Sequence, residues 1–478
     1  MTDGIAKVNK IFRNTRVLSV AAFSFLFAYL LSFLFEGQVL YKIIDVFDAQ
    51  TEPYILSAII AHLAGLFSCG YFIKSRRVSK LAMTGSMAVC LICTVPFFFA
   101  PSALWLFGLI IAGFTGGIAV AAWGYFLKTL TPKNERIKTC ADVLIFSNMI
   151  MIAINVVAMN VSHIIGLMLS IICLIIGGAL TWMLPANPTQ VPLQKIRSKS
   201  FDDIKKPMVV LFLFVTVITI NSGLMYQVIN PAFDHLTGLV SWYWAVPYIL
   251  TLAFVRNLPF KIKVHRSLFL YVGMGMIIAA FISFMLLGRG TTDYLVVDTL
   301  MLGACGIFDL FWWSIIGETL DYTSNPVKVF GIGLSANVLG VLLGDVLGVS
   351  ITSIELSGAE VAVIALSVVC ITLVILPPLN QQLVILLKNN AYLNAYDRMD
   401  KKQQDEVIFL TKLIEPLTER ERGVLQFVLA GKSNKEISAE LFITESTVKT
   451  HVRNIFYKYD VSSRAELIST LLKNQAAT

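Results

Sequence analysis

Residues 17–35 read VLSVAAFSFLFAYLLSFLF, an apolar run without a charged side chain. An α-helix needs about 20 predominantly apolar residues to cross the ~30 Å hydrocarbon core of a bilayer. Similar runs recur until there are twelve, and each predicts one membrane-spanning helix. They lie near 17–35, 53–73, 81–100, 102–127, 140–161, 163–184, 208–230, 239–255, 267–287, 294–317, 330–352 and 360–380. The sequence therefore predicts an all-α, polytopic membrane bundle of twelve transmembrane helices.

The charged residues divide the chain into two regions of different composition. Of the 478 residues, 56% are hydrophobic and only 14% are charged, whereas soluble domains carry about 25% charged residues. The last 98 residues contain 26 charged side chains, and the first 380 contain 42. This contrast excludes a single soluble domain, a secreted disulfide scaffold and a disordered chain. The region after residue 380 has the composition of an ordinary soluble domain.

The basic residues predict the orientation of the bundle. Residues 1–16 and the loops after the second, fourth, sixth, eighth and tenth spans together hold 22 Lys and Arg. The loops on the opposite side hold only Lys42 and Arg289. Because cytoplasmic loops carry the excess of Lys and Arg, we predict that both termini are cytoplasmic.

The twelve spans form two sets of six, which we place in residues 1–184 and 208–380, separated by a cytoplasmic central loop at 185–207. Each set carries a short basic loop after its second span. Duplicated six-helix halves resemble the major facilitator superfamily, which binds its substrates between the halves near the membrane midplane. The signature of that family after the second span is Gly-x-Leu-x-Asp-Arg-x-Gly-Arg, but residues 70–77 read GYFIKSRR. Lys74 in place of the Asp argues against a working transport cycle.

A polar domain follows the membrane region. We predict a helical linker at 381–415 and a compact domain at 416–478. Residues 417–461 read LTERERGVLQFVLAGKSNKEISAELFITESTVKTHVRNIFYKYDV. Three capping boxes, in which Ser or Thr precedes Glu by three residues, begin at Thr418, Ser433 and Ser463, and Thr444 begins a further helix. These signals predict four helices, near 419–429, 434–441, 445–458 and 464–473.

The third of these helices has two different faces. Its apolar residues recur at intervals of four, three and four, which predicts a stripe docked on the first two helices. The stripe consists of Val448, Val452, Ile455 and Tyr459, and the other side carries Lys449, Thr450, Arg453 and Tyr457. A short turn at 442–444 joins the second and third helices. This arrangement predicts a helix-turn-helix whose third helix enters a DNA major groove.

The same residues resemble the LuxR-type DNA-binding domain. LTERE at 417–421, GKSNKEI at 431–437 and TVKTH at 447–451 match that family in order and spacing, whereas Gly423 replaces a usual Glu. The resemblance implies promoter DNA as a partner, a homodimer formed through Leu467 and Leu471 of the fourth helix, and a bacterial inner membrane as the location. It also implies which side chains meet DNA. Lys449, Thr450 and Arg453 would face bases, and Asn434, Lys435, Ser446, Thr447 and Lys458 would hold phosphates.

Polar and ionisable residues inside the spans are candidates for a ligand site, because burying a charge in a bilayer is costly. The candidates are Glu36, Asn148, Asn155, Asn221, Gln227, Asp309, Trp312, Asn337 and Asp345. One interpretation is a cavity between the halves with a polar centre and aromatic walls. The other is that these groups hydrogen-bond between helices. We expect no metal site, no cofactor and no enzymatic activity, because no ligand spacing or nucleophile–base set is visible.

We therefore predict a membrane-bound one-component transcription regulator, which senses an unknown small molecule through its transporter-like part. One alternative is a secondary transporter of the major facilitator type with an appended regulatory DNA-binding domain. A second is a membrane anchor that responds to a protein partner.

Overall fold

The computed structural model describes residues 2–35, 37–48, 52–132, 135–185, 201–258, 266–320, 323–353, 360, 363–379, 415–430, 432, 434–461, 467 and 471. These residues form two compact units. One contains the described helices of residues 2–185, 211–320 and 325–375, and the other includes the C-terminal domain from residue 415. The described residues are helical or irregular and contain no strand, which confirms the all-α prediction.

The membrane unit consists of apolar helices, most of them long. In the first half they are α1 (Thr2–Tyr29), α2 (Gln38–Val46), α3 (Glu52–Phe72), α4 (Arg76–Thr94), α5 (Ala103–Leu130), α6 (Arg136–Asn160) and α7 (His163–Met183). In the second half they are α8 (Phe201–Leu224), α9 (Thr237–Tyr243), α10 (Val246–Asn257), α12 (Arg266–Leu286), α13 (Thr291–Thr319) and α14 (Pro326–Ser353). Among the described residues, 11 helical segments are long and apolar enough to cross a membrane. A shorter apolar helix, Val363–Leu379, occupies the position of the predicted twelfth span.

The first span of each half departs from a regular α-helix. α1 continues into a π-helical turn, Leu30–Leu34, and α8 continues into a second one, Met225–Ile229. In each turn a backbone N–H bonds the carbonyl five residues back, at 2.8 Å from Phe35 to Leu30 and at 2.9 Å from Asn230 to Met225. π-Turns inside α-helices are often found at functional sites. Their equivalent positions are consistent with a duplicated half.

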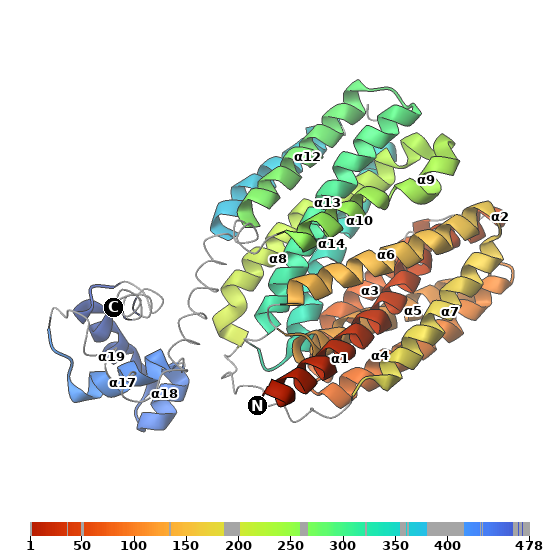
Figure 1. The fold of residues 1–478 in the computed structure, drawn as a ribbon. Helices are drawn as coiled ribbons and strands as arrows, with labels where there is room; N and C mark the ends of the chain where they lie inside the picture. Colours follow the sequence, from red (N-terminus) through yellow and green to blue (C-terminus); the bar gives the residue numbers. More distant parts are fainter. Residues whose placement is uncertain are drawn as a thin grey trace. The chain divides into compact units, whose positions relative to one another are not determined.

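Small residues allow several helices to pack closely. Residues 340–348 of α14 contain Gly at every fourth position, as expected for close helix packing in a membrane. A Cβ atom built on Gly344 would lie 2.2 Å from the Ile220 carbonyl oxygen of α8, and one on Gly340 would lie 2.3 Å from that of Thr216. A Cβ on Gly117 of α5 would lie 2.4 Å from a carbonyl of α3. Larger side chains would push these helices apart. Figure 1 shows α1 to α7 as one group and α8 to α14 as a second group beside it.

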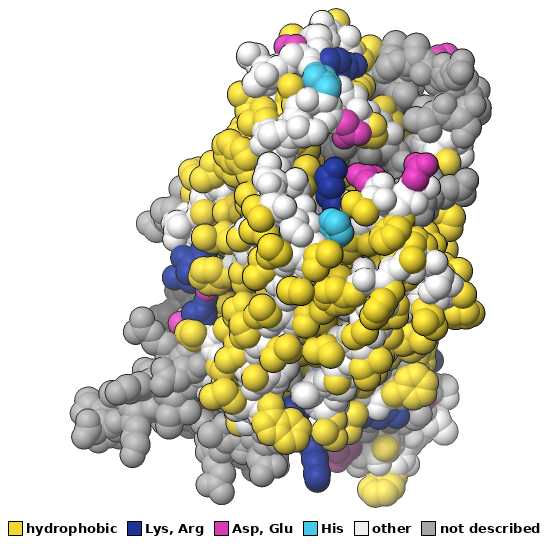
Figure 2. Space-filling model, turned by 90° about the vertical axis from the view of Figure 1, so that its right-hand side faces the viewer, with side chains coloured by type: hydrophobic (Ala, Val, Ile, Leu, Met, Phe, Trp, Pro, Cys, Tyr) yellow, Lys and Arg dark blue, Asp and Glu magenta, His cyan; other side chains and the backbone are white. Residues whose placement is uncertain are grey.

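The outer surface of this unit is apolar. Figure 2 shows a broad band of hydrophobic side chains, with Lys, Arg, Asp and Glu side chains toward its upper and lower parts and at its left edge. Phe72, Leu286 and Val374 are among the exposed large hydrophobic residues. An apolar patch of this extent is not found on soluble monomers and is expected of a surface that contacts lipid.

The C-terminal unit contains the predicted helices at the predicted positions. They are α17 (Glu419–Leu429), α18 (Asn434–Leu441) and α19 (Glu445–Lys458). Its core consists of Val424, Leu425, Val428, Leu429, Ile437, Val448, Ile455, Tyr459, Leu467 and Leu471. Val452, predicted for the buried stripe, packs at the margin of this core. The predicted linker at 381–415 lies outside the described residues except for Glu415, as does the predicted fourth helix except for Leu467 and Leu471. Both leucines are buried within the domain, so the described structure does not expose them for a dimer contact.

Candidate DNA-binding surface and membrane cavity

Local sequence signals position the two helices of the candidate DNA-binding surface. The Thr444 hydroxyl oxygen accepts a hydrogen bond from the Thr447 backbone N–H at 3.2 Å, which begins α19. Phe442, in the turn before α19, has a φ of 54°, and its side chain is 94% exposed. A left-handed residue reverses the chain within a few positions. The turn thereby directs α19 across α18.

The predicted reading face of α19 is exposed. Lys449, Thr450 and Arg453 all lie at the surface, while Val448 and Ile455 of the same helix are fully buried. The Lys449 side chain is 64% exposed and forms an ion pair with Glu445 at 3.1 Å. Exposed pairs of this kind contribute little, roughly 0.3–0.5 kcal/mol, and are easily exchanged for another anion. The face is therefore available for a polyanion.

The predicted phosphate contacts have different environments. Ser446 and Thr447, in the first turn of α19, are exposed, and Asn434 at the start of α18 is half-buried. The Lys435 side chain lies outside the described residues. Backbone N–H groups at a helix start are well suited to bind phosphate, because their partial positive charge faces outward. Ser446 and Thr447 lie at such a position.

Lys458 differs from its predicted role. Its ammonium group donates to the Glu421 carboxylate at 2.8 Å and to the Pro416 carbonyl at 2.9 Å, and its side chain is only 12% exposed. This contact joins the end of α19 to the start of α17, so Lys458 stabilises the domain instead of presenting a free charge to phosphate. The sequence contained no signal for the pair, because its members are 37 residues apart.

The Glu421 carboxylate is held by contacts from Lys458 and Thr418. Its carboxylate accepts hydrogen bonds from Lys458 and from the Thr418 backbone N–H, at 2.8 and 2.9 Å, which completes the predicted capping box at Thr418. Burial disfavours the charged carboxylate, but the Lys458 ammonium and the Thr418 contacts outweigh burial, and the pKa of Glu421 is lowered.

A cavity of about 200 Å³ lies between the two halves of the membrane unit. Helices of both halves supply its walls, including both first spans near their π-helical turns. The lining residues are Phe27, Leu31, His62, Leu66, Val120, Leu144, Asn148, Ser222, Met225, Tyr226, Trp244, Ala245, Tyr248, Leu302, Cys305, Asp309, Trp312, Trp313, Leu334, Asn337, Val338 and Val341. Aromatic and aliphatic side chains thus surround a few polar groups, as in sites for small molecules.

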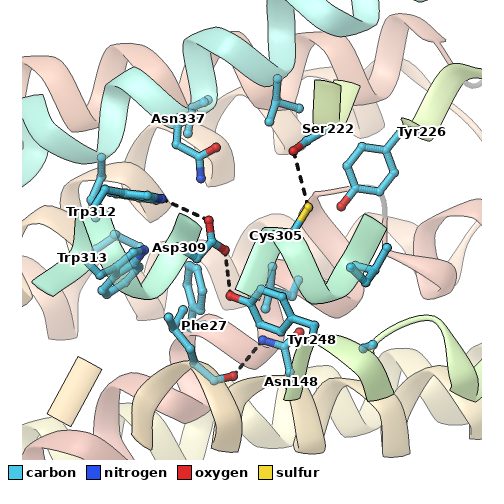
Figure 3. A pocket seen from close by; sticks show the side chains of 18 of the residues that line it. Phe27, Asn148, Ser222, Tyr226, Tyr248, Cys305, Asp309, Trp312, Trp313 and Asn337 are labelled. Atoms are coloured by element: carbon cyan, nitrogen blue, oxygen red, sulfur yellow. Dashed lines mark hydrogen bonds between the residues drawn. The ribbon is translucent and has the colours of Figure 1, made fainter. Parts of the chain in front are cut away.

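Asp309 of α13 lies at the polar centre of this cavity (Figure 3). Its carboxylate accepts a hydrogen bond from the Tyr248 hydroxyl at 2.7 Å and another from the Trp312 indole N–H at 3.1 Å. The Asn337 side chain points toward it from α14. Tyr248 belongs to α10, 61 residues earlier in the chain, so this arrangement depends on the packing of three helices.

The structure brings together four of the nine predicted ligand-site residues: Asn148, Asp309, Trp312 and Asn337 line the cavity. Asn155, Asn221 and Asp345 are buried but do not line it, and neither does Gln227. Glu36 lies outside the described residues. Asn221 is buried, as the interpretation of hydrogen bonds between helices requires. Its amide, however, donates to the Ile218 carbonyl of its own helix at 3.4 Å, so this contact does not join two helices.

Several lining residues were not among the candidates, notably His62, Tyr226, Trp244, Tyr248 and Trp313. Aromatic residues are common throughout the spans, and sequence alone does not show which of them face inward. Among the described residues, no group of three His, Cys, Asp or Glu side chains is placed to hold a metal ion.

A second set of contacts joins the halves at the end of the bundle that we predict to be cytoplasmic. Asp142 of α6 accepts from Arg16 of α1 at 2.6 Å and from Arg256 of α10 at 2.5 Å. The Asn325 amide donates to the Gly70 carbonyl at 2.7 Å. Gly70 therefore makes a contact between the halves even though the signature that follows it is altered.

Comparisons with known proteins agree with both parts of the structure. Residues 415–471 match the family model described as "Bacterial regulatory proteins, luxR family". A nitrate/nitrite response regulator homolog of Haemophilus influenzae is 53% identical over 51 residues, which are 11% of this chain and 24% of that protein. The transcriptional regulatory protein LiaR of Bacillus subtilis is 56% identical over 52 residues, 11% of this chain and 25% of that protein. The chain thus spans about a quarter of the length of these curated relatives.

The membrane unit is similar in fold to solved transporters. The human organic anion transporter MFSD10 superposes with a TM-score of 0.56 at 14% identity, over 77% of this chain and 98% of that one. The nucleoside transporter NupG superposes with a TM-score of 0.50 at 15% identity, over 77% of this chain and 99% of that one. At such identities the likeness shows the fold alone. The chain therefore combines a LuxR-type helix-turn-helix domain with a membrane unit whose fold is similar to that of these solved transporters.

Proposed function

We propose that this combination of a LuxR-type domain and a transporter-like fold works as a membrane-bound one-component transcription regulator. The membrane unit binds a small molecule, and the C-terminal domain binds promoter DNA. The observation that carries the proposal is the exposed face of α19, with Lys449 and Arg453 on the side away from the fully buried Val448 and Ile455. A basic face on the third helix of a helix-turn-helix fits the edges of guanine in the major groove.

The cavity supports the sensing part of the proposal. Both halves line the cavity. A ligand that binds more tightly at one spacing of the halves therefore shifts the conformational equilibrium toward that spacing. The contacts of Asp142 with Arg16 and Arg256 hold one such spacing at the end of the bundle. The regulatory signal then passes through residues 381–415 to the DNA-binding domain, which pairs with a second copy on DNA. Both termini face the cytoplasm of a bacterium, and the bundle lies in its inner membrane.

The test uses the full-length chain in lipid nanodiscs. Chromosomal fragments bound by the wild-type protein are recovered and sequenced, and the fragments are then titrated with the wild-type protein and with Arg453→Ala. The proposal predicts recovery of a small set of promoter sites, each bound more weakly by the variant. Recovery of random fragments with equal affinity for both proteins would contradict it.

Transport is the alternative, and its supporting observation is the superposition of 77% of this chain on 98% of MFSD10. Saturable, gradient-driven uptake of a cavity ligand into proteoliposomes would favour it. The response of DNA binding to the same ligand separates the two functions.

A further inference from the structure

From the composition of the cavity we infer that its ligand is a small organic cation with one ring, such as a protonated arylalkylamine. This inference rests on the proposed sensing function and specifies its ligand class. Asp309 is the one carboxylate among the described residues that line the cavity, and none of them is Lys or Arg. A carboxylate at membrane depth without a positive partner is costly, and a cationic ligand supplies the missing charge.

The geometry around Asp309 leaves room for an additional donor. An ionised carboxylate has about four lone-pair sites. Tyr248 donates to one oxygen and Trp312 to the other, so each oxygen keeps one site for a ligand. The Asp309 side chain is only partly buried and faces the cavity (Figure 3). A ligand ammonium can therefore reach both oxygens without displacing the donors that fix the carboxylate.

The walls next to Asp309 suit the remaining part of such a ligand. The two donors are themselves ring residues, so their rings lie beside the carboxylate. The Trp313 ring packs against Trp312 and Phe27, with centroid separations of 5.7 and 5.8 Å. Cations are attracted to aromatic faces, and more strongly when both are shielded from water. An anion would instead meet the like charge of Asp309, with no Lys or Arg among the described lining residues to offset it.

The volume of the cavity limits the size of the ligand. An apolar cavity of about 150 Å³ accommodates benzene. The observed volume of about 200 Å³ therefore accommodates one six-membered ring and a short side chain. The amide groups of Asn148 and Asn337 and the Ser222 hydroxyl also line the cavity and can bind polar substituents on that ring.

The experiment compares three probes of nearly equal size and different charge: 2-phenylethylammonium, 2-phenylethanol and 3-phenylpropanoate. Binding to the full-length protein in nanodiscs is followed by tryptophan fluorescence, because three of the seven tryptophans line the cavity. We expect the cation to bind at least about tenfold more tightly than the alcohol, as for a hydrogen bond to a charged group, and the anion to bind most weakly. Equal affinities for the cation and the alcohol in the wild-type protein, or tighter binding of the anion, would overturn the inference.

Two variants of the same helix identify the group responsible. Asp309→Asn should remove the preference for the cation over the alcohol. Asp298→Asn should keep that preference, because Asp298 is also a buried carboxylate of α13 but does not line the cavity. If Asp309→Asn fails to fold, the three probes on the wild-type protein still decide the ligand class. If the cation binds as expected but DNA affinity never responds to it, the ligand class stands and the proposed regulatory function fails.

Discussion

Replacing Arg453 with alanine should impair DNA recognition without harming the fold. The Arg453 side chain is exposed on α19, and within the described part of the domain it forms no hydrogen bond or ion pair. Surface substitutions of this kind usually change stability by less than about 0.5 kcal/mol. The melting temperature of the variant should therefore stay close to that of the wild-type protein.

The expected loss in DNA affinity follows from the chemistry of arginine. Arg can donate two hydrogen bonds to O6 and N7 of guanine, and such a pair contributes roughly 1–3 kcal/mol of discrimination. Since about 1.4 kcal/mol corresponds to a tenfold change in the dissociation constant, Arg453→Ala should bind its cognate site about 5- to 150-fold more weakly. Binding to scrambled DNA should weaken much less, because phosphate contacts dominate it.

The assay is a fluorescence-anisotropy titration of cognate and scrambled duplexes at several salt concentrations, with full-length protein in nanodiscs. Arg420→Ala is the matched control, because Arg420 is also exposed but lies on α17, away from the proposed reading face. Lys435→Ala should weaken both duplexes similarly and reduce the salt slope by roughly one. If Arg453→Ala weakens both duplexes to the same extent, the assignment of Arg453 to base reading is wrong.

Three further predictions concern stability. Glu421→Gln should destabilise the C-terminal domain by about 1–3 kcal/mol, since it leaves the Lys458 ammonium without its carboxylate. The pKa of Glu421 is lowered in the folded state, so the stability that its carboxylate contributes is present above the unfolded pKa and is lost as the pH falls. The melting temperatures of the wild type and the variant should therefore converge at acid pH. Gly423→Ala should stabilise α17 by about 0.5–1 kcal/mol, because a Cβ there meets no atom within 4 Å; an unchanged melting temperature would contradict this. Gly344→Leu should lower the melting temperature of the membrane unit in detergent, because a Cβ at Gly344 meets the backbone of α8. Gly275→Leu should not, because a Cβ at Gly275 meets no atom within 4 Å.

The C-terminal domain shows how far local signals determine structure. Its three described helices begin and end at the predicted residues. Thr418 and Thr444 begin α17 and α19 through hydrogen bonds that span three positions. The Glu421–Lys458 pair was not predictable in the same way, since the tertiary fold alone brings the two residues together. The phosphate contact of Lys458 therefore stays a prediction, and its ammonium group is paired with Glu421 within the domain.

For the membrane unit, the sequence predicted the helical spans but not the local geometry of the helices or the contacts between them. Apolar length predicted twelve spans, and the described residues contain 11 helices long enough to cross a membrane and one shorter apolar helix at the position of the twelfth. It contained no signal for the π-helical turns at Leu30–Leu34 and Met225–Ile229, whose side chains are as apolar as those of a regular helix. Rarity of charge in the spans identified Asp309. Its partner Tyr248 could not be identified, because Tyr residues are frequent in the spans and only helix packing selects one of them.

The most direct test of the central claim is whether occupancy of the membrane cavity changes the affinity for DNA. The full-length protein in nanodiscs is titrated with a cognate promoter fragment, first without ligand and then with a compound that saturates the cavity in the fluorescence assay. Coupling between two binding sites is typically 1–3 kcal/mol, so the dissociation constant for DNA should change by about 5- to 150-fold, in either direction. An identical dissociation constant with the cavity empty and saturated would contradict the account of a one-component regulator that senses its ligand through the membrane unit.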